Sequence, residues 1–239
     1  MRWAFHCALS VSLSLPLACF AFNFMHGDVS VQFGGFGSSQ GKSQDIDIVS
    51  LVGNHYTVNK NNSGKGLFGI GYFVDVLDKD RFKISYGING FYLGKTSVSG
   101  TIIQEHEFTN LAYSYKIQHV PVFLAAKANV KTNSNKYNIT FDAGVGPDFI
   151  RSSQYNETPL DNVTLPDNAF TTHSNVGVSA MAGVGLRLNN VFGKAPLECG
   201  YRFFYLGQGR LQMNNNQLLD TLKSGNSNYA NALLCSIIL

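Results

Sequence analysis

Charge is scarce in this sequence and forms no pattern. Only 14% of the 239 residues are charged, whereas an ordinary soluble domain has about 25%. The formal net charge is +3, and no basic run or basic stripe occurs. A protein that binds nucleic acid gathers Lys and Arg on one face or along one helix. The composition therefore argues against nucleic acid as a partner.

Cysteines are few as well. Four occur in the chain, and two of them, Cys7 and Cys19, lie near its start. The sequence has no Cys-x-x-Cys pair and no Cys/His spacing typical of a metal site. We therefore predict no cofactor and no metal. We expect Cys199 and Cys235 to be reduced, with a disulfide as the alternative, because neighbouring strands could bring them together in an oxidising compartment.

Long apolar runs are absent after the first segment, "MRWAFHCALSVSLSLPLACFA". That segment has a positive start, an apolar stretch and a small-x-small site at Cys19–Ala21, which is the layout of a secretory signal peptide. We expect residues 1–21 to be the signal peptide and residues 22–239 the mature barrel domain. An uncleaved anchor and a lipidated Cys19 are the alternatives. No later stretch reaches about 20 apolar residues, the length of a transmembrane helix.

What the chain does have is alternation with a period of two residues. In "VGVSAMAGVGLRL" the even positions from Val176 to Leu188 are apolar, and the odd positions hold Gly, Ser, Met or Arg. Such alternation is typical of a β-strand with one apolar face and one small or polar face. The pattern predicts eight strands, near residues 29–36, 66–76, 82–93, 112–128, 137–149, 176–188, 197–206 and 229–239.

One predicted strand changes phase. Between 112 and 128 the apolar positions are first odd, as at Tyr115, and then even, as at Leu124. A β-bulge near Gln118 and His119 would restore a single apolar face, because a bulge adds one residue to one strand.

The connections between the predicted strands alternate in length. Short ones fall near 77–81, 129–136 and 189–195, and long ones, rich in Asn, Ser, Gly and Thr, span about 37–65, 95–111, 151–175 and 207–228. Short turns at one end and long loops at the other are typical of an outer-membrane β-barrel. We expect the long loops to be exposed and mobile, and open to protease from outside the cell.

Across the short turns, the alternation restricts how the strands can pair. Apolar residues meet apolar ones under a register that pairs Val76 with Phe82, Ala128 with Tyr137 and Leu188 with Leu197. We predict two ion pairs on the other face, Asp75 with Lys83 and Arg187 with Glu198. They belong to a predicted network of polar side chains inside the barrel: Asp75, Lys83, Lys127, Asp142, Arg187, Glu198 and Arg202.

The apolar face decides which side of the barrel is outside. A soluble lipocalin-like carrier would turn it inward, whereas an outer-membrane barrel turns it toward lipid. Aromatic residues near strand ends suit the two membrane interfaces. We predict that role for Phe82, Tyr92, Tyr113, Tyr115, Tyr137, Phe149 and Tyr205. The fold is therefore predicted to be all-β, an eight-stranded antiparallel up-and-down transmembrane β-barrel preceded by a cleavable signal peptide.

The stretches "FDAGVGPDF", "AMAGVGLRL", "LECGYRFFYLGQG" and the terminal strand carry a resemblance. Over about 22–239 the chain resembles the small outer-membrane β-barrels of Gram-negative bacteria, the OmpA-like and opacity-protein-like family. The resemblance implies location in the cell outer membrane, contact with outer-membrane lipid and lipopolysaccharide, and insertion by the barrel-assembly machinery. It also implies a surface antigen with a host or surface ligand at its loops, and a role in adhesion or envelope integrity.

Catalytic chemistry has little support in the sequence. Some small outer-membrane barrels modify lipids with a Ser, a His and an acid at one membrane interface. The candidates here are His173 beside Ser174, and His119, but no spacing places a nucleophile and a base within hydrogen-bond reach. His55 and His106 have no metal-ligand spacing. We predict a non-enzymatic surface protein without a wide pore; the alternatives are an interfacial lipid-modifying enzyme and a soluble lipocalin-like carrier.

Overall fold

The computed structural model describes residues 27–59, 63–134, 136–161, 163–193, 195–225 and 228–239. The predicted signal peptide and its cleavage site lie outside these residues. The strands are β1 (Gly27–Ser39), β2 (Gln44–Ile48), β3 (Leu51–Tyr56), β4 (Ser63–Asp78), β5 (Phe82–Leu93), β6 (Thr96–Gln104), β7 (Phe108–Lys131), β8 (Tyr137–Pro159), β9 (Phe170–Thr171), β10 (His173–Phe192), β11 (Ala195–Leu206), β12 (Gln212–Met213) and β13 (Asn228–Ile238). Within the described part of the chain, no helix has the length and apolarity to span a membrane.

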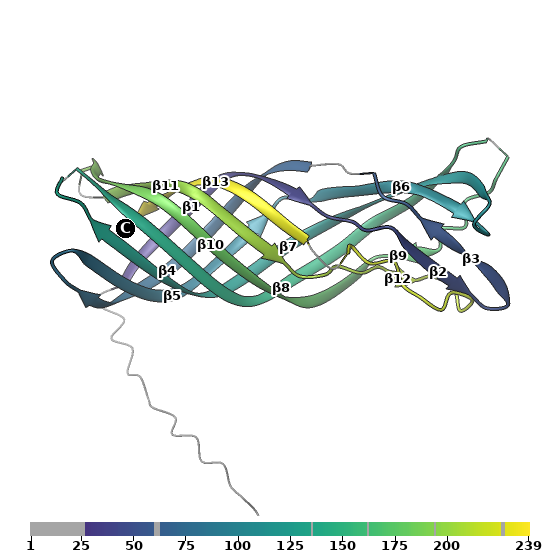
Figure 1. Cartoon of the computed structure of the whole chain (residues 1–239), viewed down its shortest axis with the longest axis horizontal. Coiled ribbons are helices and arrows are strands. Elements are labelled where there is room, and N and C mark those ends of the chain that lie inside the picture. The colour runs from purple at the N-terminus through teal and green to yellow at the C-terminus, as the bar shows by residue number, and fades with distance from the viewer. Residues whose placement is uncertain (1–26, 60–62, 135, 162, 194, 226–227) are drawn as a thin grey trace, which may run out of the picture.

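Eight of these strands form a closed ring. Each pairs antiparallel with its neighbours in the order β1, β4, β5, β7, β8, β10, β11 and β13, and β13 pairs with β1 again. Figure 1 shows these strands wound obliquely around a common axis. Closure removes both sheet edges, which a membrane could not leave unpaired. The predicted eight-stranded antiparallel barrel is confirmed, and each predicted segment overlaps a ring strand.

The apolar end of the chain is the strand that closes the ring. β13 pairs with β1 from Ser30 opposite Ile238 to Ser39 opposite Tyr229. Side chains along it alternate between the two faces, so that Leu234 is 6% exposed and Leu233, its neighbour, is 70% exposed. The final residues therefore form part of the barrel wall.

Beyond the ring, the sheet continues into an extension. β7 and β8 are 24 and 23 residues long, and their distal halves leave the ring. There β6 pairs with β7, β3 with β6 and β2 with β3, while β9 and β12 form a separate two-stranded sheet. Figure 1 shows this part of the molecule at the right-hand end. We call it the extension; its described residues are 40–59, 95–117, 151–161, 163–172 and 207–225.

The composition of the long connections suggested exposed, mobile loops, but the structure has strands within them. β2 and β3 lie within the first of them, β6 within the second, and the end of β8 within the third. The reason is that these Asn- and Ser-rich segments still carry alternating apolar residues such as Ile46 and Ile102, each 1% exposed. These residues pack into a shared core, which a count of polar residues does not reveal.

The predicted bulge at Gln118 and His119 is wrong. Odd positions of β7 face inward without interruption from Leu111 to Asn129, and the register shift against β8 lies between Ser114 and Lys116. The strand therefore keeps its phase. What changes along it is the content of the interior, which is apolar in the extension and more polar in the barrel.

The three short hairpins keep the predicted parity. Leu188 pairs with Leu197, as predicted. Asp75, however, pairs with Ser85 because a bulge follows Asp75 in β4, and Lys127 pairs with Asp142 because β7 and β8 run further into their turn than expected. Both shifts are even in number, so each side chain keeps the face that the alternation gave it.

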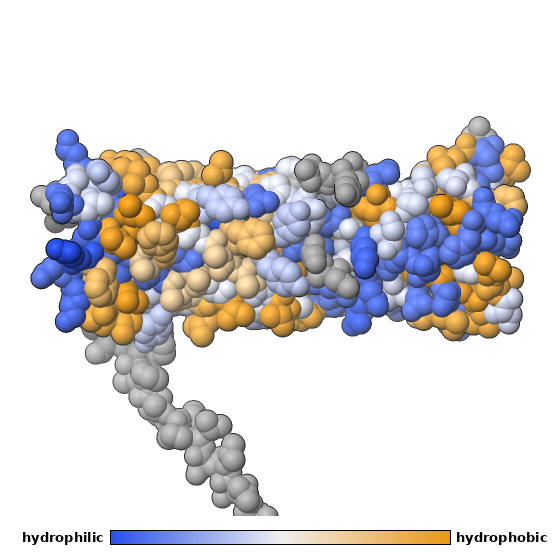
Figure 2. All heavy atoms as spheres, viewed as in Figure 1, coloured by the Kyte–Doolittle hydropathy of each residue, from blue (hydrophilic) through white to orange (hydrophobic). Residues whose placement is uncertain are grey.

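The outer face of the ring is apolar. Leu124, Val178 and Leu233 are 67–70% exposed there, and Figure 2 shows orange residues over the left-hand half of the molecule. To its left is a blue end, and to its right the extension has a larger share of blue. This surface is opposite to that of a soluble lipocalin-like carrier, which would bury its apolar side chains inside.

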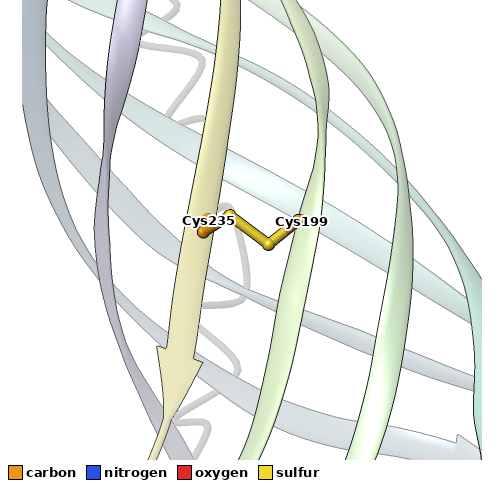
Figure 3. Close-up of a disulfide and its surroundings, with 2 residues drawn as sticks. All are labelled: Cys199 and Cys235. Atoms are coloured by element: carbon orange, nitrogen blue, oxygen red, sulfur yellow. A yellow bond between two sulfur atoms is a disulfide. The ribbon is translucent and has the colours of Figure 1, made fainter.

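A disulfide joins Cys199 in β11 to Cys235 in β13. The two residues are direct cross-strand partners, and their Cα atoms are 4.0 Å apart. Figure 3 shows the bond between the two neighbouring strands. Both cysteines take the outward parity, as expected, but the expectation that they are reduced is wrong. The register places the two side chains beside each other, and an oxidising compartment favours their bond.

Candidate functional site

Five of the seven predicted interface aromatics point outward from the barrel. Their exposed fractions are 38–50%, and they are Phe82, Tyr92, Tyr137, Phe149 and Tyr205. Tyr92, Phe149 and Tyr205 lie toward the extension, and Phe82 and Tyr137 lie beside the short turns. Phe68, opposite Tyr92, and Tyr229, opposite Tyr205, are also exposed, at 52% and 38%, but were not predicted.

The other two aromatics, Tyr113 and Tyr115, are not on the outer surface. They are 3% and 2% exposed and belong to the apolar core of the extension. Tyr113 donates a hydrogen bond to the Thr57 carbonyl oxygen at 2.7 Å. Burial raises the pKa of both hydroxyl groups, so they stay neutral. The membrane-interface prediction is wrong for these two, because β7 at this height has left the ring.

Four charged side chains of the predicted network meet inside the barrel. The Lys127 ammonium donates to both carboxylate oxygens of Glu198 at 3.0 Å. Arg202 binds Asp142 through Nε at 3.2 Å and also through Nη2. All four are at most 8% exposed. Buried charges of opposite sign in contact stabilise one another, and removing one partner leaves the other uncompensated.

The network continues through uncharged side chains that the sequence did not single out. Arg202 Nη1 donates to Gln32 Oε1 at 2.5 Å, and Gln32 Nε2 donates to Asn89 Oδ1 at 2.7 Å and to Ser30 Oγ at 3.2 Å. Gln32 is 1% exposed, and Asn89 is fully buried. Their signal in the sequence is only that each takes the inward parity of its strand.

At the short-turn end the predicted pairs are partly rearranged. Lys83 binds Asp75 at 2.5 Å, although the two are not direct cross-strand neighbours. Arg187 and Glu198 are such neighbours, yet no ion pair joins them among the described residues, since Glu198 binds Lys127 instead. Arg187 lines a small cavity of about 20 Å³ with Lys83 and Lys127. Strand register determines which residues are adjacent. Which of them form an ion pair depends on how far each side chain extends across the lumen.

Above the charged layer, aromatic rings fill the lumen. Phe91, Phe123 and Phe204 are 0–2% exposed, and their ring centroids are 5.1–6.1 Å apart. The Arg202 guanidinium lies 5.5 Å from the centre of the Phe91 ring, a favourable cation–π contact. The barrel interior is thus filled by side chains, as is expected for eight strands.

His119 is buried too deeply to act as a catalytic base. Its Nδ1 is 2.7 Å from Asp148 Oδ2, and the two side chains are 2% and 0% exposed. Gly207 N donates to the same Asp148 oxygen at 3.1 Å. This pair connects β7, β8 and the end of β11 inside the molecule, where a lipid substrate has no access.

His173 and Ser174 do not form a nucleophile–base pair. They are adjacent residues of β10, so their side chains point to opposite faces of the sheet. Ser174 is on the exposed outer face and His173 is on the half-buried inner one. The arrangement therefore lacks the contact through which a base would activate a serine.

The extension has its own apolar core. Ile46, Tyr56, Ile102, Leu111, Ile117 and Leu222 are 0–1% exposed and share one cluster. The buried Glu157 carboxylate ties a loop to this core by accepting hydrogen bonds from the backbone N–H groups of residues 167–169 at 2.8–3.2 Å and from the Tyr155 hydroxyl at 2.5 Å. The extension is therefore a packed structure held in one arrangement.

Apolar side chains reappear on the surface at the tip of the extension. They come from the β2–β3 turn, the start of β7 and two loops, with exposed fractions of 47–85%. We call them the tip patch: Val49, Leu51, Val52, Phe108, Leu160, Val163, Leu165 and Leu219. Backbone hydrogen bonds from Leu219 N to Asp47 O and from Leu160 N to Asn110 O tie the loops to the neighbouring strands. Figure 2 shows orange residues at this right-hand end.

The architecture is that of an outer-membrane β-barrel. A ring without edges, an apolar outer face and an interior filled by side chains satisfy the requirements that a bilayer places on strands. The ring therefore lies in a membrane. A closed barrel of antiparallel β-strands is the architecture of bacterial outer-membrane proteins, which places this ring in the outer membrane.

Comparison with known proteins gives likenesses of shape alone. No protein-family model matches the chain, and no curated protein matches its sequence. Among solved structures, the outer membrane protein OprG from Pseudomonas aeruginosa is 12% identical with a TM-score of 0.48, over 90% of this chain and 96% of that one. The outer membrane protease OmpT from Escherichia coli is 8% identical with a TM-score of 0.48, over 92% and 98%. Ail, the attachment invasion locus protein of Yersinia pestis, is 11% identical with a TM-score of 0.33, over 90% and 100%.

Proposed function

We propose that this protein is a non-enzymatic surface protein that uses its barrel as a membrane anchor and its extension to contact another surface. The tip patch carries the proposal. Its exposed apolar residues share one end of the extension, where Figure 2 shows orange residues among blue ones. Exposed apolar surface rimmed by polar residues marks an interaction site. A packed extension holds these residues away from the membrane in a fixed arrangement.

The filled lumen supports an anchor rather than a channel. The Lys127–Glu198 and Arg202–Asp142 pairs lie across the interior, and the rings of Phe91, Phe123 and Phe204 lie above them. No wide aqueous path is expected through such a barrel. We propose an adhesive role, in which the partner is a host cell or a solid surface in the environment.

Basic residues support the expected contact with lipopolysaccharide. Lys65, Lys95, Lys116 and Arg151 are exposed where the apolar outer face gives way to the extension. Cations at this height are placed to meet lipid phosphates, as polybasic residues do at anionic membrane surfaces. This orientation turns the extension toward the outside of the cell and the short turns toward the periplasm.

The adhesive role can be tested with a tip variant on whole cells. Cells producing Leu51→Ser/Val52→Ser/Leu165→Ser should bind cultured epithelial cells and hydrocarbon-coated surfaces less than cells producing the unchanged protein. A matched variant with exposed polar residues of the extension replaced, Asn156→Ser/Thr158→Ser/Gln212→Ser, should bind as well as the unchanged protein.

Folding of each variant is checked by gel mobility with and without heating, since a folded barrel migrates differently when boiled. Equal adhesion by the tip variant and the unchanged protein, with both barrels folded, would refute the role of the tip patch. Adhesion no greater than that of cells lacking the protein would refute the adhesive function itself.

A further inference from the structure

Three side chains with metal-binding atoms meet on the outer surface of the extension. Asp45 is in β2, His55 in β3 and His106 in the turn between β6 and β7. Their ligand atoms all lie within 4.8 Å of one another. His55 Nδ1 is 2.6 Å from Asp45 Oδ1, and His106 Nε2 is 4.0 Å from the same oxygen. The sequence spacing had suggested no metal site at these histidines.

The pairing of β2 with β3 and of β3 with β6 brings these side chains together. Asp45 and His55 are direct cross-strand partners, so their side chains share one face. The residues next to them, Ile46 and Tyr56, are buried in the core of the extension, which leaves Asp45 and His55 on the outer face. β3 in turn pairs with β6, with His55 opposite Ile103. The turn that follows β6 therefore begins beside His55.

The turn itself is shaped to bring His106 back to this face. Glu105 and His106 both have positive φ angles, 53° and 63°, a conformation that costs free energy for residues other than Gly. Glu105 N donates to Asn54 Oδ1 at 3.3 Å, which fastens the turn to β3. The His55 and His106 rings are 6.1 Å apart between centroids.

We propose that Asp45, His55 and His106 bind a divalent transition-metal ion, with Zn²⁺ as the expected ion. Imidazole nitrogens favour Zn²⁺ and its neighbours in the first transition row, whereas Mg²⁺ and Ca²⁺ prefer oxygen ligands throughout. Two His and one carboxylate are a known zinc ligand set that leaves the fourth position to water.

The distances fit this ion after small side-chain rotations. Ligands about 2.0–2.1 Å from a tetrahedral zinc ion lie about 3.3 Å apart. Relative to about 3.3 Å, the Asp45–His55 distance must lengthen and the Asp45–His106 distance must shorten by about 0.7 Å each. All three side chains are exposed enough to rotate. Asp45 binds as a carboxylate, the form that an exposed Asp takes at neutral pH.

The bound ion would join the β2–β3 hairpin to the β6–β7 turn. These are the two segments that carry Leu51 and Phe108, so the ion would fix two parts of the tip patch relative to each other. The metal site requires only its own three ligands and does not depend on the proposed adhesive function.

The test is zinc binding by the full chain, folded in detergent micelles and carrying no histidine tag. Competition against a chromophoric chelator should show one saturable Zn²⁺ site per chain. His55→Ala, His106→Ala and Asp45→Asn should each weaken binding at least about tenfold, since even outer-shell changes cost that much at metal sites. His173→Ala and Asp47→Asn, a histidine and a carboxylate outside the cluster, should leave binding unchanged.

Heat-modified gel mobility shows whether each variant is folded, and it should not change because the site lies outside the barrel. Absence of a saturable site in the folded protein would overturn the proposal. So would equal zinc affinity in the unchanged protein and in both His55→Ala and His106→Ala, or a loss of affinity in the two control variants.

Discussion

The barrel and the extension are built from the same strands with opposite polarity. In the barrel part of β7, Leu124 points out to lipid and Lys127 points in to a charged layer. In the extension part of the same strand, Ser114 points out and Tyr113 points into an apolar core. The strand keeps its phase, so the difference lies in the solvent on each side. Lipid accepts the apolar face of a barrel, whereas water requires that face to be buried.

The height at which the polarity inverts therefore marks the membrane boundary. On β7 it lies between Ser114 and Val120, because the outward residues change there from Ser114, Lys116 and Gln118 to Val120, Val122 and Leu124. The exposed Lys116 lies at this height. The two regions should respond differently to the same kind of substitution, and four comparisons test that.

The largest loss is expected from Arg202→Ala in the barrel. It leaves Asp142 buried without its partner, and breaking a buried pair in this way costs about 3–5 kcal/mol. Urea unfolding in lipid vesicles measures the loss, and a double-mutant cycle with Asp142→Ala isolates the coupling of the pair. Arg187→Ala is the matched control, since no ion pair to Arg187 is present in the described part of the chain. An equal loss of stability in Arg202→Ala and Arg187→Ala would mean that the Arg202–Asp142 pair adds no stability of its own.

A similar loss, confined to the extension, is expected from Leu111→Ala. Leu111 is 1% exposed in the apolar core, and a buried Leu→Ala substitution costs about 2–5 kcal/mol. Because the barrel has its own packing, limited proteolysis near residues 160–168 should become faster while the urea midpoint of the barrel stays the same. A fall in that midpoint would show that the two regions unfold together.

A charged residue on the outer face of β7 should destabilise the barrel more than the extension. Leu124→Arg places a cation on the lipid-facing surface, at a cost of about 2–4 kcal/mol near the bilayer midplane. Ser114→Arg places the same side chain on the outer face of the extension, where a surface substitution changes stability by no more than about 0.5 kcal/mol. Equal losses in folding yield and urea midpoint would contradict the membrane boundary proposed between them.

The smallest effect is expected from Lys131→Ala. Lys131 binds Asp78 at 2.6 Å beside the short turns, where the side chains are 38% and 60% exposed. Exposed ion pairs are weak because water screens them, so the urea midpoint should not change measurably. Lys127→Ala, on the same strand, should lower it clearly, since its partner Glu198 is 4% exposed. A large change at Lys131 would show that the barrel end is drier than its exposure indicates.

Sequence alternation determined the ring. Period-two patterning marked all eight barrel strands, and even the incorrect hairpin registers kept the correct face, because a register error of an even number of residues preserves parity. The same parity placed Lys127, Asp142, Glu198 and Arg202 on the inner face. It did not show that Glu198 binds Lys127 rather than Arg187, since contact across a lumen depends on side-chain reach and on strand stagger.

Tertiary structure alone decided the extension and its surface. Alternation does not say which solvent meets each face, so Tyr113 and Tyr115 looked lipid-facing although they are buried. Residues far apart in the chain, such as His55 and His106, met only because β3 pairs with β6. Cys199 and Cys235 likewise became a disulfide because β13 lies beside β11. Local pattern sets the face of each residue, and pairing between distant strands sets its neighbours.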